Sequence, residues 1–293
     1  MFRKILIASD LSPASDSVVN CTEGFIQLGV EQVYLCHALG LRHMKDLKYE
    51  LIRKVEPQLA AQKQILEGQG FEVSVEIPSG IPSEEINRLA EEKDVSLIVI
   101  GSHGESQAHH LLFKFGGVAS EVLHSHQKPL LMVRTKVSQD EKGEICVEAS
   151  CADFRAHVLY ATDFSDTAQR AFEYVEAIVK SGCEEVTLMH VQDSTRIEKH
   201  LEHKLDEFNK IDRKRLEMRK TRLEELGARN VDIKIPYGKP ITEILQELQR
   251  TDYSLAVMGS QGRGFIKEVF LGSVSHHVTR EAETSVLLVP ALR

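Results

Sequence analysis

The feature that most constrains this chain is an internal repeat. The stretch KILIASDLS at residues 4–12 reappears 153 positions later as HVLYATDFS at residues 157–165. Further blocks follow in the same order at offsets of 156 or 158: IPSGIPSEEI (77–86) with IPYGKPITEI (235–244), DVSLIVIGSHG (94–104) with DYSLAVMGSQG (252–262), and GGVASEVLHSHQKPLLMV (116–133) with GSVSHHVTREAETSVLLV (272–289). Chance does not produce collinear blocks of this kind, so the 293-residue chain is a tandem duplication.

Each half predicts the same order of elements. Short apolar runs such as ILIAS, LIVIG and LLMV in the first half, and VLYAT, LAVMG and VLLV in the second, alternate with helix-like stretches. Strands that are apolar on both faces and separated by helices predict a parallel sheet covered on both sides. The expected fold class is therefore α/β, with two tandem five-stranded doubly wound parallel-sheet domains at residues 1–135 and 156–293, joined by a linker over residues 136–155.

The composition of the chain disfavours some kinds of binding partner. The net charge of −8 disfavours broad binding to nucleic acid or to an anionic membrane. The basic run at residues 212–222 is interpreted as a solvated helix face. No apolar run is long enough to span a bilayer, and the start MFRKILIASD is too short for a signal peptide, so we expect a cytoplasmic protein. The five cysteines are too scattered for a disulfide framework, and Cys146 and Cys151 are read as reduced thiols in preference to a zinc site.

Glycines gather in the second half where a strand ends and a helix begins. Gly259 and Gly262 follow the apolar run SLAVM, and Gly272 and Ser273 open the next helix-like segment. In a parallel sheet ligands bind at the carboxyl ends of the strands, and a helix N-terminus offers unpaired N–H groups to an anion. The pattern predicts a nucleotide phosphate, with Arg263 as a cation; the alternative is that the glycines only form turns.

The spacing Gly259-x2-Gly262-x9-Gly272-Ser273 resembles the ATP-binding signature of the universal stress protein family. The resemblance covers nearly the whole chain and implies an adenine nucleotide alpha-hydrolase-like fold. It also implies ATP or another adenine nucleotide as ligand, with Mg left open. The matching positions are Asp163, His190, Val191, Gly238, Met258, Gly259, Gly262, Arg263, Gly264, Gly272, Ser273, Val274 and Ser275. Core packing is an equal alternative for Met258, and capping of the following helix is one for Asp163.

The first half departs from this signature. Its loop is two residues longer, Glu105 stands in place of Arg263, and Gly117 stands in place of Ser273. A carboxylate repels a phosphate, and the missing hydroxyl removes a donor. We therefore predict that the N-terminal half does not hold ATP in the manner of the family. The adjacent His109 and His110 would point apart and are not read as a metal site.

Binding is favoured over catalysis, because the chain has no Walker A sequence and no evident general base or magnesium carboxylate pair beside the glycines. The leading hypothesis is a stress-response module for which the nucleotide is a regulatory ligand. A slow ATP-hydrolysing or self-phosphorylating enzyme and a non-nucleotide scaffold are the alternatives. In the family, single-domain members pair through the last strand, so the two halves are expected to pair with each other about a pseudo-twofold axis; a homodimer is left open.

Overall fold

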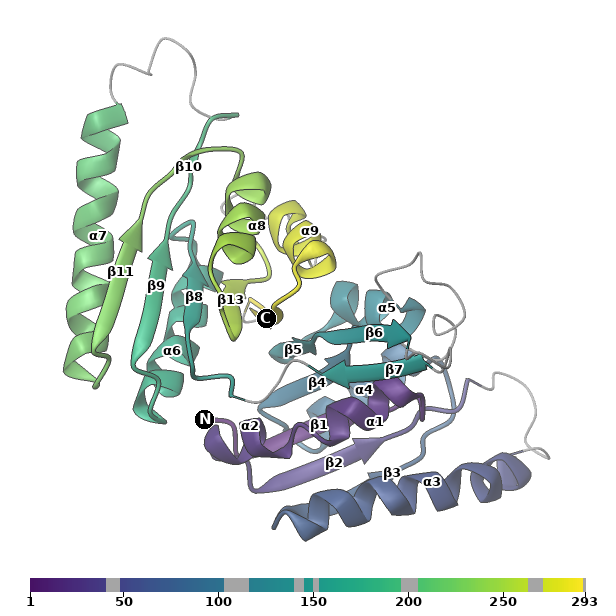
Figure 1. Ribbon diagram of the computed structural model, residues 1–293. Coiled ribbons are helices and arrows are strands. Elements are labelled where there is room, and N and C mark those ends of the chain that lie inside the picture. The colour runs from purple at the N-terminus through teal and green to yellow at the C-terminus, as the bar shows by residue number, and fades with distance from the viewer. Residues whose placement is uncertain are drawn as a thin grey trace. The chain divides into compact units, whose positions relative to one another are not determined.

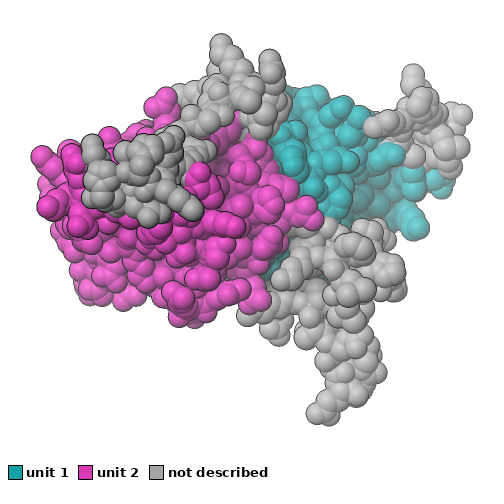
Figure 2. Space-filling view, turned by 90° about the horizontal axis from the view of Figure 1, so that it is seen from above, with its two compact units in different colours: residues 1–152 teal, residues 153–293 magenta. Residues whose placement is uncertain are grey.

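The structure is a computed structural model that describes residues 1–40, 48–102, 116–139, 145–149, 153–195, 205–262 and 271–291. The chain divides into two compact units, residues 1–152 and 153–293, which Figure 2 colours separately. Within the described ranges, no helix is long and apolar enough to cross a membrane. Cys36 and Cys183 are buried free thiols, and Cys21 takes part in a disulfide.

Unit 1 is built around a parallel sheet. Its elements are β1 (Lys4–Ala8), α1 (Pro13–Val19), α2 (Thr22–Gln27), β2 (Gln32–Cys36), α3 (Lys48–Gly68), β3 (Glu72–Glu76), α4 (Pro82–Glu92), β4 (Leu97–Gly101), α5 (Gly117–Ser125), β5 (Leu130–Val133), β6 (Thr135–Gln139) and β7 (Ile145–Ala149). In the described part of the unit the parallel strands run in the order β5-β4-β1-β2-β3. Strand β4 is buried along its whole length, as expected for a sheet covered by helices on both faces.

Unit 2 repeats this plan. It contains β8 (Val158–Ala161), α6 (Asp166–Lys180), β9 (Glu185–Met189), β10 (Gln192–Asp193), α7 (Leu205–Glu225), β11 (Asn230–Lys234), β12 (Tyr237–Gly238), α8 (Pro240–Arg250), β13 (Leu255–Gly259), α9 (Ser273–Glu281) and β14 (Ser285–Val289). Its described parallel strands run in the order β11-β9-β8-β13-β14. Helices α6 and α7 lie on one face of this sheet, and α8 and α9 lie together on the other (Figure 1). The α/β doubly wound fold class predicted from the sequence is confirmed.

Two details differ from the sequence-based expectation. The predicted linker contains a hairpin, in which β6 and β7 pair antiparallel with Thr135 opposite Ala149, and β7 lies beside α1. The helix that follows the first strand is continuous as α6 in unit 2 but is divided into α1 and α2 in unit 1. The division falls at Asn20, whose side chain donates to the Asp16 carbonyl and so ends α1.

Candidate functional site

A cavity of about 520 Å³ opens at the carboxyl ends of β8, β9 and β13 in unit 2, a size in the range of small-molecule sites. Loops after these strands form its floor, and α7, α8 and α9 contribute walls. Its lining residues are Ala161, Thr162, Asp163, Ala168, Met189, His190, Val191, Gln192, Asp193, Phe208, Ile211, Asp212, Arg215, Pro240, Ile244, Met258, Gly259, Gln261, Gly262, Gly272, Ser273, Val274 and Ser275. This is the crevice in which doubly wound folds place their ligands.

The loop after β8 holds Asp163 in a fixed orientation. The Oδ1 atom of Asp163 accepts from the Ser165 amide at 3.0 Å, and Phe164 between them adopts a left-handed φ of 60°. Ser165, rather than Asp163, caps α6, because its hydroxyl accepts from the Ala168 amide at 3.3 Å. The alternative role of Asp163 as the helix cap is therefore wrong, and the carboxylate faces the cavity.

The two glycines at the end of β13 lie close to different neighbours, so a side chain would meet a different obstacle at each position. A Cβ on Gly259 would lie 2.7 Å from Thr167 Oγ1 and 2.8 Å from the Ala168 backbone nitrogen, so the packing of α6 against the strand excludes any side chain. A Cβ on Gly262 would instead lie 2.8 Å from Asp163 Oδ2. Gly262 thus leaves room for a carboxylate at the cavity rim, whereas Gly259 leaves room for a helix.

The start of α9 forms the wall on the β13–β14 side. Gly272 is the N-cap, and its own N–H donates to the Ser260 carbonyl at 2.7 Å. The first-turn residues Ser273, Val274 and Ser275 have no intrahelical acceptor for their N–H groups. Ser273 is exposed, but the buried Ser275 hydroxyl already donates to the Ser260 carbonyl at 2.9 Å. The backbone of this turn can therefore meet an anion, with the Ser273 side chain as an additional donor.

The end of β9 forms the opposite wall. The N–H group of His190 donates to the carbonyl of Lys234, the last residue of β11, and that of Gln192 donates to the carbonyl of Pro236 just beyond it. Backbone groups alternate in direction along a strand, so those of Val191 point away from β11, towards the space beyond the end of β8. The peptide groups of Val191, for which the described residues provide no backbone partner, therefore face the cavity, where a ligand with a complementary donor and acceptor can use them.

His190 is locked in this wall. Its Nδ1 lies 2.7 Å from the Thr162 carbonyl, which can only accept, so Nδ1 carries a hydrogen. Its Nε2 lies 3.5 Å from Asp212 Oδ2, and its ring contacts that of Phe164 in a tilted arrangement with a centroid distance of 4.6 Å. Both nitrogens of the imidazole therefore face hydrogen-bond acceptors.

The remaining predicted residues fall in three groups. Met258 is buried in the sheet and also lines the cavity, so both interpretations of it hold. Gly238 lies in β12 beside Glu243, whose Oε1 would overlap a Cβ there, and it does not line the cavity. Arg263 and Gly264, like Glu105, His109, His110 and Cys151, lie outside the described residues. Within the described residues no group of three His, Cys, Asp or Glu is arranged to hold a metal.

Sequence reasoning missed the contribution of α7. Asp212 begins the basic run predicted to be a solvated face, yet its side chain is only 13% exposed and lines the cavity. Its Oδ2 accepts from Gln192 Nε2 at 2.7 Å, and its Oδ1 lies 3.4 Å from Arg215. The sequence did contain a signal. It was the polar Gln192, directly after the strand end at His190 and Val191, together with an acidic residue on the helix that follows.

The equivalent crevice of unit 1 is built differently. Asp10 also accepts from the amide two residues on, and Leu11 is also left-handed, with a φ of 63°. However, the Ser15 hydroxyl donates to Asp10 Oδ1 at 2.5 Å, whereas unit 2 has Ala168 at that position. The carboxylate of Asp10 is therefore engaged from within its own loop.

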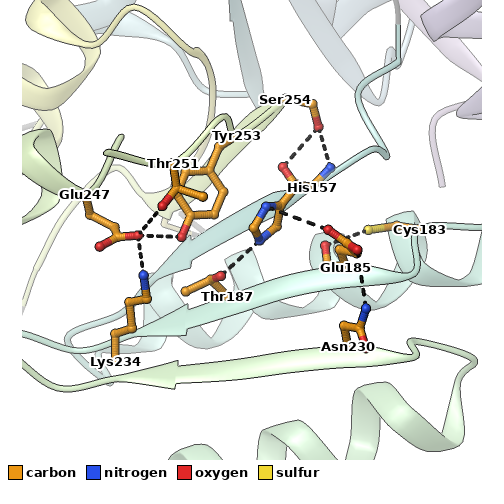
Figure 3. A network of polar contacts seen from close by, with 10 residues as sticks. All are labelled: His157, Cys183, Glu185, Thr187, Asn230, Lys234, Glu247, Thr251, Tyr253 and Ser254. Atoms are coloured by element: carbon orange, nitrogen blue, oxygen red, sulfur yellow. Dashed lines mark hydrogen bonds and ion pairs between the residues drawn. The ribbon is translucent and has the colours of Figure 1, made fainter. Parts of the chain in front are cut away.

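A second polar network lies in unit 2 at the other end of α8 (Figure 3). Oε1 of the buried Glu247 accepts from Lys234 at 2.6 Å, from Tyr253 at 2.8 Å and from Thr251 at 3.1 Å. Burial acts to raise the pKa of Glu247, but the hydrogen bonds from Lys234 and Tyr253 outweigh it and lower the pKa. These contacts are internal and complete, so we assign the network to stability rather than to binding.

The chain is therefore a tandem of two doubly wound α/β units, and the second unit holds a crevice of ligand size. The model of the universal stress protein family matches the chain twice, over residues 1–134 and 155–290, so the chain belongs to the universal stress protein family.

Similar proteins agree with this assignment. The universal stress protein MJ0577 of Methanocaldococcus jannaschii is 34% identical over 161 residues, which cover 47% of this chain and 98% of that protein. The universal stress protein YxiE of Bacillus subtilis is 31% identical over 143 residues, covering 45% and 97%. A crystal structure of a universal stress protein from Archaeoglobus fulgidus is 26% identical, covers 99% of this chain and 98% of its own, and has a TM-score of 0.75.

Proposed function

We propose that unit 2 binds an adenine nucleotide, ATP, ADP or AMP, as a regulatory ligand in a stress response. The observation that carries the proposal is the convergence of residues from separate segments on one cavity. The residues come from the loop after β8, the end of β9, β13 and its following loop, and the start of α9, yet all of them line it: Asp163, Val191, Met258, Gly262 and Ser273. Apolar walls suit a base, and a glycine-lined rim beside a helix N-terminus suits phosphates.

The test is to denature the purified chain and to identify released nucleotide by chromatography and mass spectrometry, and then to titrate ATP with and without Mg²⁺ by calorimetry. We expect about one nucleotide per chain, and a loss of binding in Gly262→Asp. That substitution adds a carboxylate beside Asp163, where the two negative charges would repel each other and a phosphate.

The matched control is Gly104→Asp, the same change at the equivalent position of the N-terminal half in the sequence. If ATP occupies only the C-terminal unit, this variant keeps full binding. Two nucleotides per chain would contradict the prediction for the N-terminal half. No binding after titration with ATP and Mg²⁺ would leave a scaffold as the better hypothesis.

The alternative of slow ATP hydrolysis or self-phosphorylation predicts phosphate release or labelled protein that disappears in Asp163→Ala. Pairing of the two halves through their last strands, a homodimer and a cytoplasmic location stay predictions from the sequence.

A further inference from the structure

The carboxylate of Asp212 is an unusual group for the wall in which it lies. Its neighbours on the same face of α7 are Phe208 and Ile211, and Val191 lines the cavity close by on the β9 side. Burying a carboxylate is costly unless it is paired or hydrogen-bonded. Among the described residues, Gln192 donates to Asp212 Oδ2, His190 Nε2 lies 3.5 Å from the same oxygen, and the half-exposed Arg215 lies 3.4 Å from Oδ1.

The fold itself does not need this polar group. Helices α3 and α7 both have 21 residues, and their buried leucines, Leu59 with Leu216 and Leu66 with Leu223, coincide at an offset of 157. At that offset the equivalent of Asp212 is Val55, and at the offset of 153 the equivalent of Gln192 is Leu39. Unit 1 thus forms the same architecture with apolar residues in both positions.

The order of the strands gives the cavity two ends. Gly259, Gly262 and the start of α9 border it on the β13–β14 side, whereas Val191, Gln192 and Asp212 border it on the β9–β11 side. A ligand whose anionic part lies at the helix N-terminus therefore presents its opposite end to Asp212 and Val191.

An ionised carboxylate only accepts hydrogen bonds, and it has about four lone-pair sites. A group that approaches Asp212 Oδ1 from the cavity must therefore be a donor. The exocyclic amine of a 6-aminopurine meets this requirement, whereas the 6-oxo group of hypoxanthine places one acceptor against another.

We propose that Asp212 is a specificity-determining residue that accepts a hydrogen bond from the 6-amino group of the bound purine. The inference rests on the proposed function and extends it, because it assigns the choice of base to one side chain. The hydrogen bond from Gln192 to Oδ2 holds the carboxylate in position, and Oδ1, which Arg215 contacts at 3.4 Å, has a further lone pair with which to accept from the ligand.

The test compares the affinities of ATP, purine riboside triphosphate, which lacks the 6-substituent, and inosine triphosphate for the full chain by calorimetry. In the native protein we expect purine riboside triphosphate to bind about 10- to 100-fold more weakly than ATP, and inosine triphosphate to bind more weakly still. In Asp212→Asn, whose amide can donate as well as accept, the preference for ATP over inosine triphosphate falls by at least about tenfold.

Glu217→Gln is the matched control, because it removes the same charge from an exposed position on the same helix. It should keep the native preference. Thermal unfolding followed by circular dichroism establishes that Asp212→Asn is folded.

Equal affinities of the native protein for ATP and inosine triphosphate would overturn the inference without any variant. An unchanged preference in folded Asp212→Asn would also overturn it, while the proposed nucleotide function would stand. Binding of none of the three nucleotides would overturn the proposed function and the inference together.

Discussion

A carboxylate oxygen of Asp163 occupies the space that a side chain on Gly262 would need. The Oδ2 atom lies 2.8 Å from the position of a Gly262 Cβ, closer than a real Cβ contact. Gly262 and the acidic residue after β8 are therefore matched to each other, although they lie 99 positions apart in the sequence.

Gly262→Ala should weaken adenine nucleotide binding by about tenfold or more while it leaves stability nearly unchanged. The added methyl group displaces the free end of a flexible side chain, and the displaced carboxylate no longer lines the cavity as before. Calorimetric titration with ATP measures the first effect and urea unfolding the second.

Gly259→Ala is the contrasting variant. Its methyl group would meet the backbone at Ala168, which cannot move away, so overpacking should lower the free energy of unfolding by about 1–3 kcal/mol. If Gly262→Ala destabilised the protein as much as Gly259→Ala, the space at Gly262 would serve the fold and not a ligand.

Substitutions of the two serines of α9 should likewise differ, one affecting stability and the other affecting affinity for ATP. Ser275→Ala removes a buried hydrogen bond to the Ser260 carbonyl and should lower stability by about 1 kcal/mol. Ser273→Ala changes an exposed side chain and should affect affinity for ATP more than stability. The reverse outcome, in which Ser275→Ala lost affinity and Ser273→Ala lost stability, would contradict these assignments.

The buried His126 of unit 1 should make stability depend on pH. Burial lowers its pKa from 6.5 to about 4, and within the described residues its Nε2 has no hydrogen-bond partner. As the pH falls below 6.5 the unfolded chain takes up a proton before the folded chain does. The stabilisation is complete above 6.5 and declines by about 1.4 kcal/mol per pH unit until about pH 4.

Urea unfolding of His126→Gln and of the native chain at pH 7.5 and pH 5 measures this effect. Between these values the native chain should lose about 2 kcal/mol more than the variant. Parallel losses in the two proteins would mean that His126 is accessible to protons in the folded state.

The network around Glu247 should show coupling between its members. Glu247→Leu, which introduces the residue that unit 1 has as Leu89, leaves the buried Tyr253 hydroxyl without this acceptor. It should lower the free energy of unfolding by about 1–3 kcal/mol. The further change Tyr253→Phe removes the orphaned hydroxyl, so the double variant should be more stable than the sum of the two single effects implies. Strict additivity would argue against the network.

The sequence predicted the fold better than the site. The alternation of fully apolar runs such as LIVIG with helices, repeated in the same order in both halves, predicts a parallel sheet whatever the loops do. The hairpin of β6 and β7 was missed because the charged stretch DEKGE, between two five-residue segments, has the composition of a linker.

The site was predicted where backbone conformation or close approach limits the residue type. The backbone of α6 excludes a side chain at Gly259 and the Asp163 carboxylate lies where one would stand at Gly262, and such close approaches leave a mark in the sequence. Asp212 leaves only a weak mark, because a single acidic residue in a charged helix has the same pattern as a solvated one until the helix is docked. Gly238 is not among the residues that line the cavity, and the Glu243 side chain lies where its Cβ would stand, so its assignment to the site stays a prediction.

The equal length of α3 and α7 has a practical consequence. Since the buried leucines of the two helices coincide at an offset of 157, a residue of α7 has a counterpart at the matching position of α3. The chain therefore carries its own internal reference. A substitution that acts through the shared framework should have similar effects when it is made in either unit. One that acts through a ligand should have an effect in one unit alone. Both are measured in the same chain, under identical solvent, temperature and concentration.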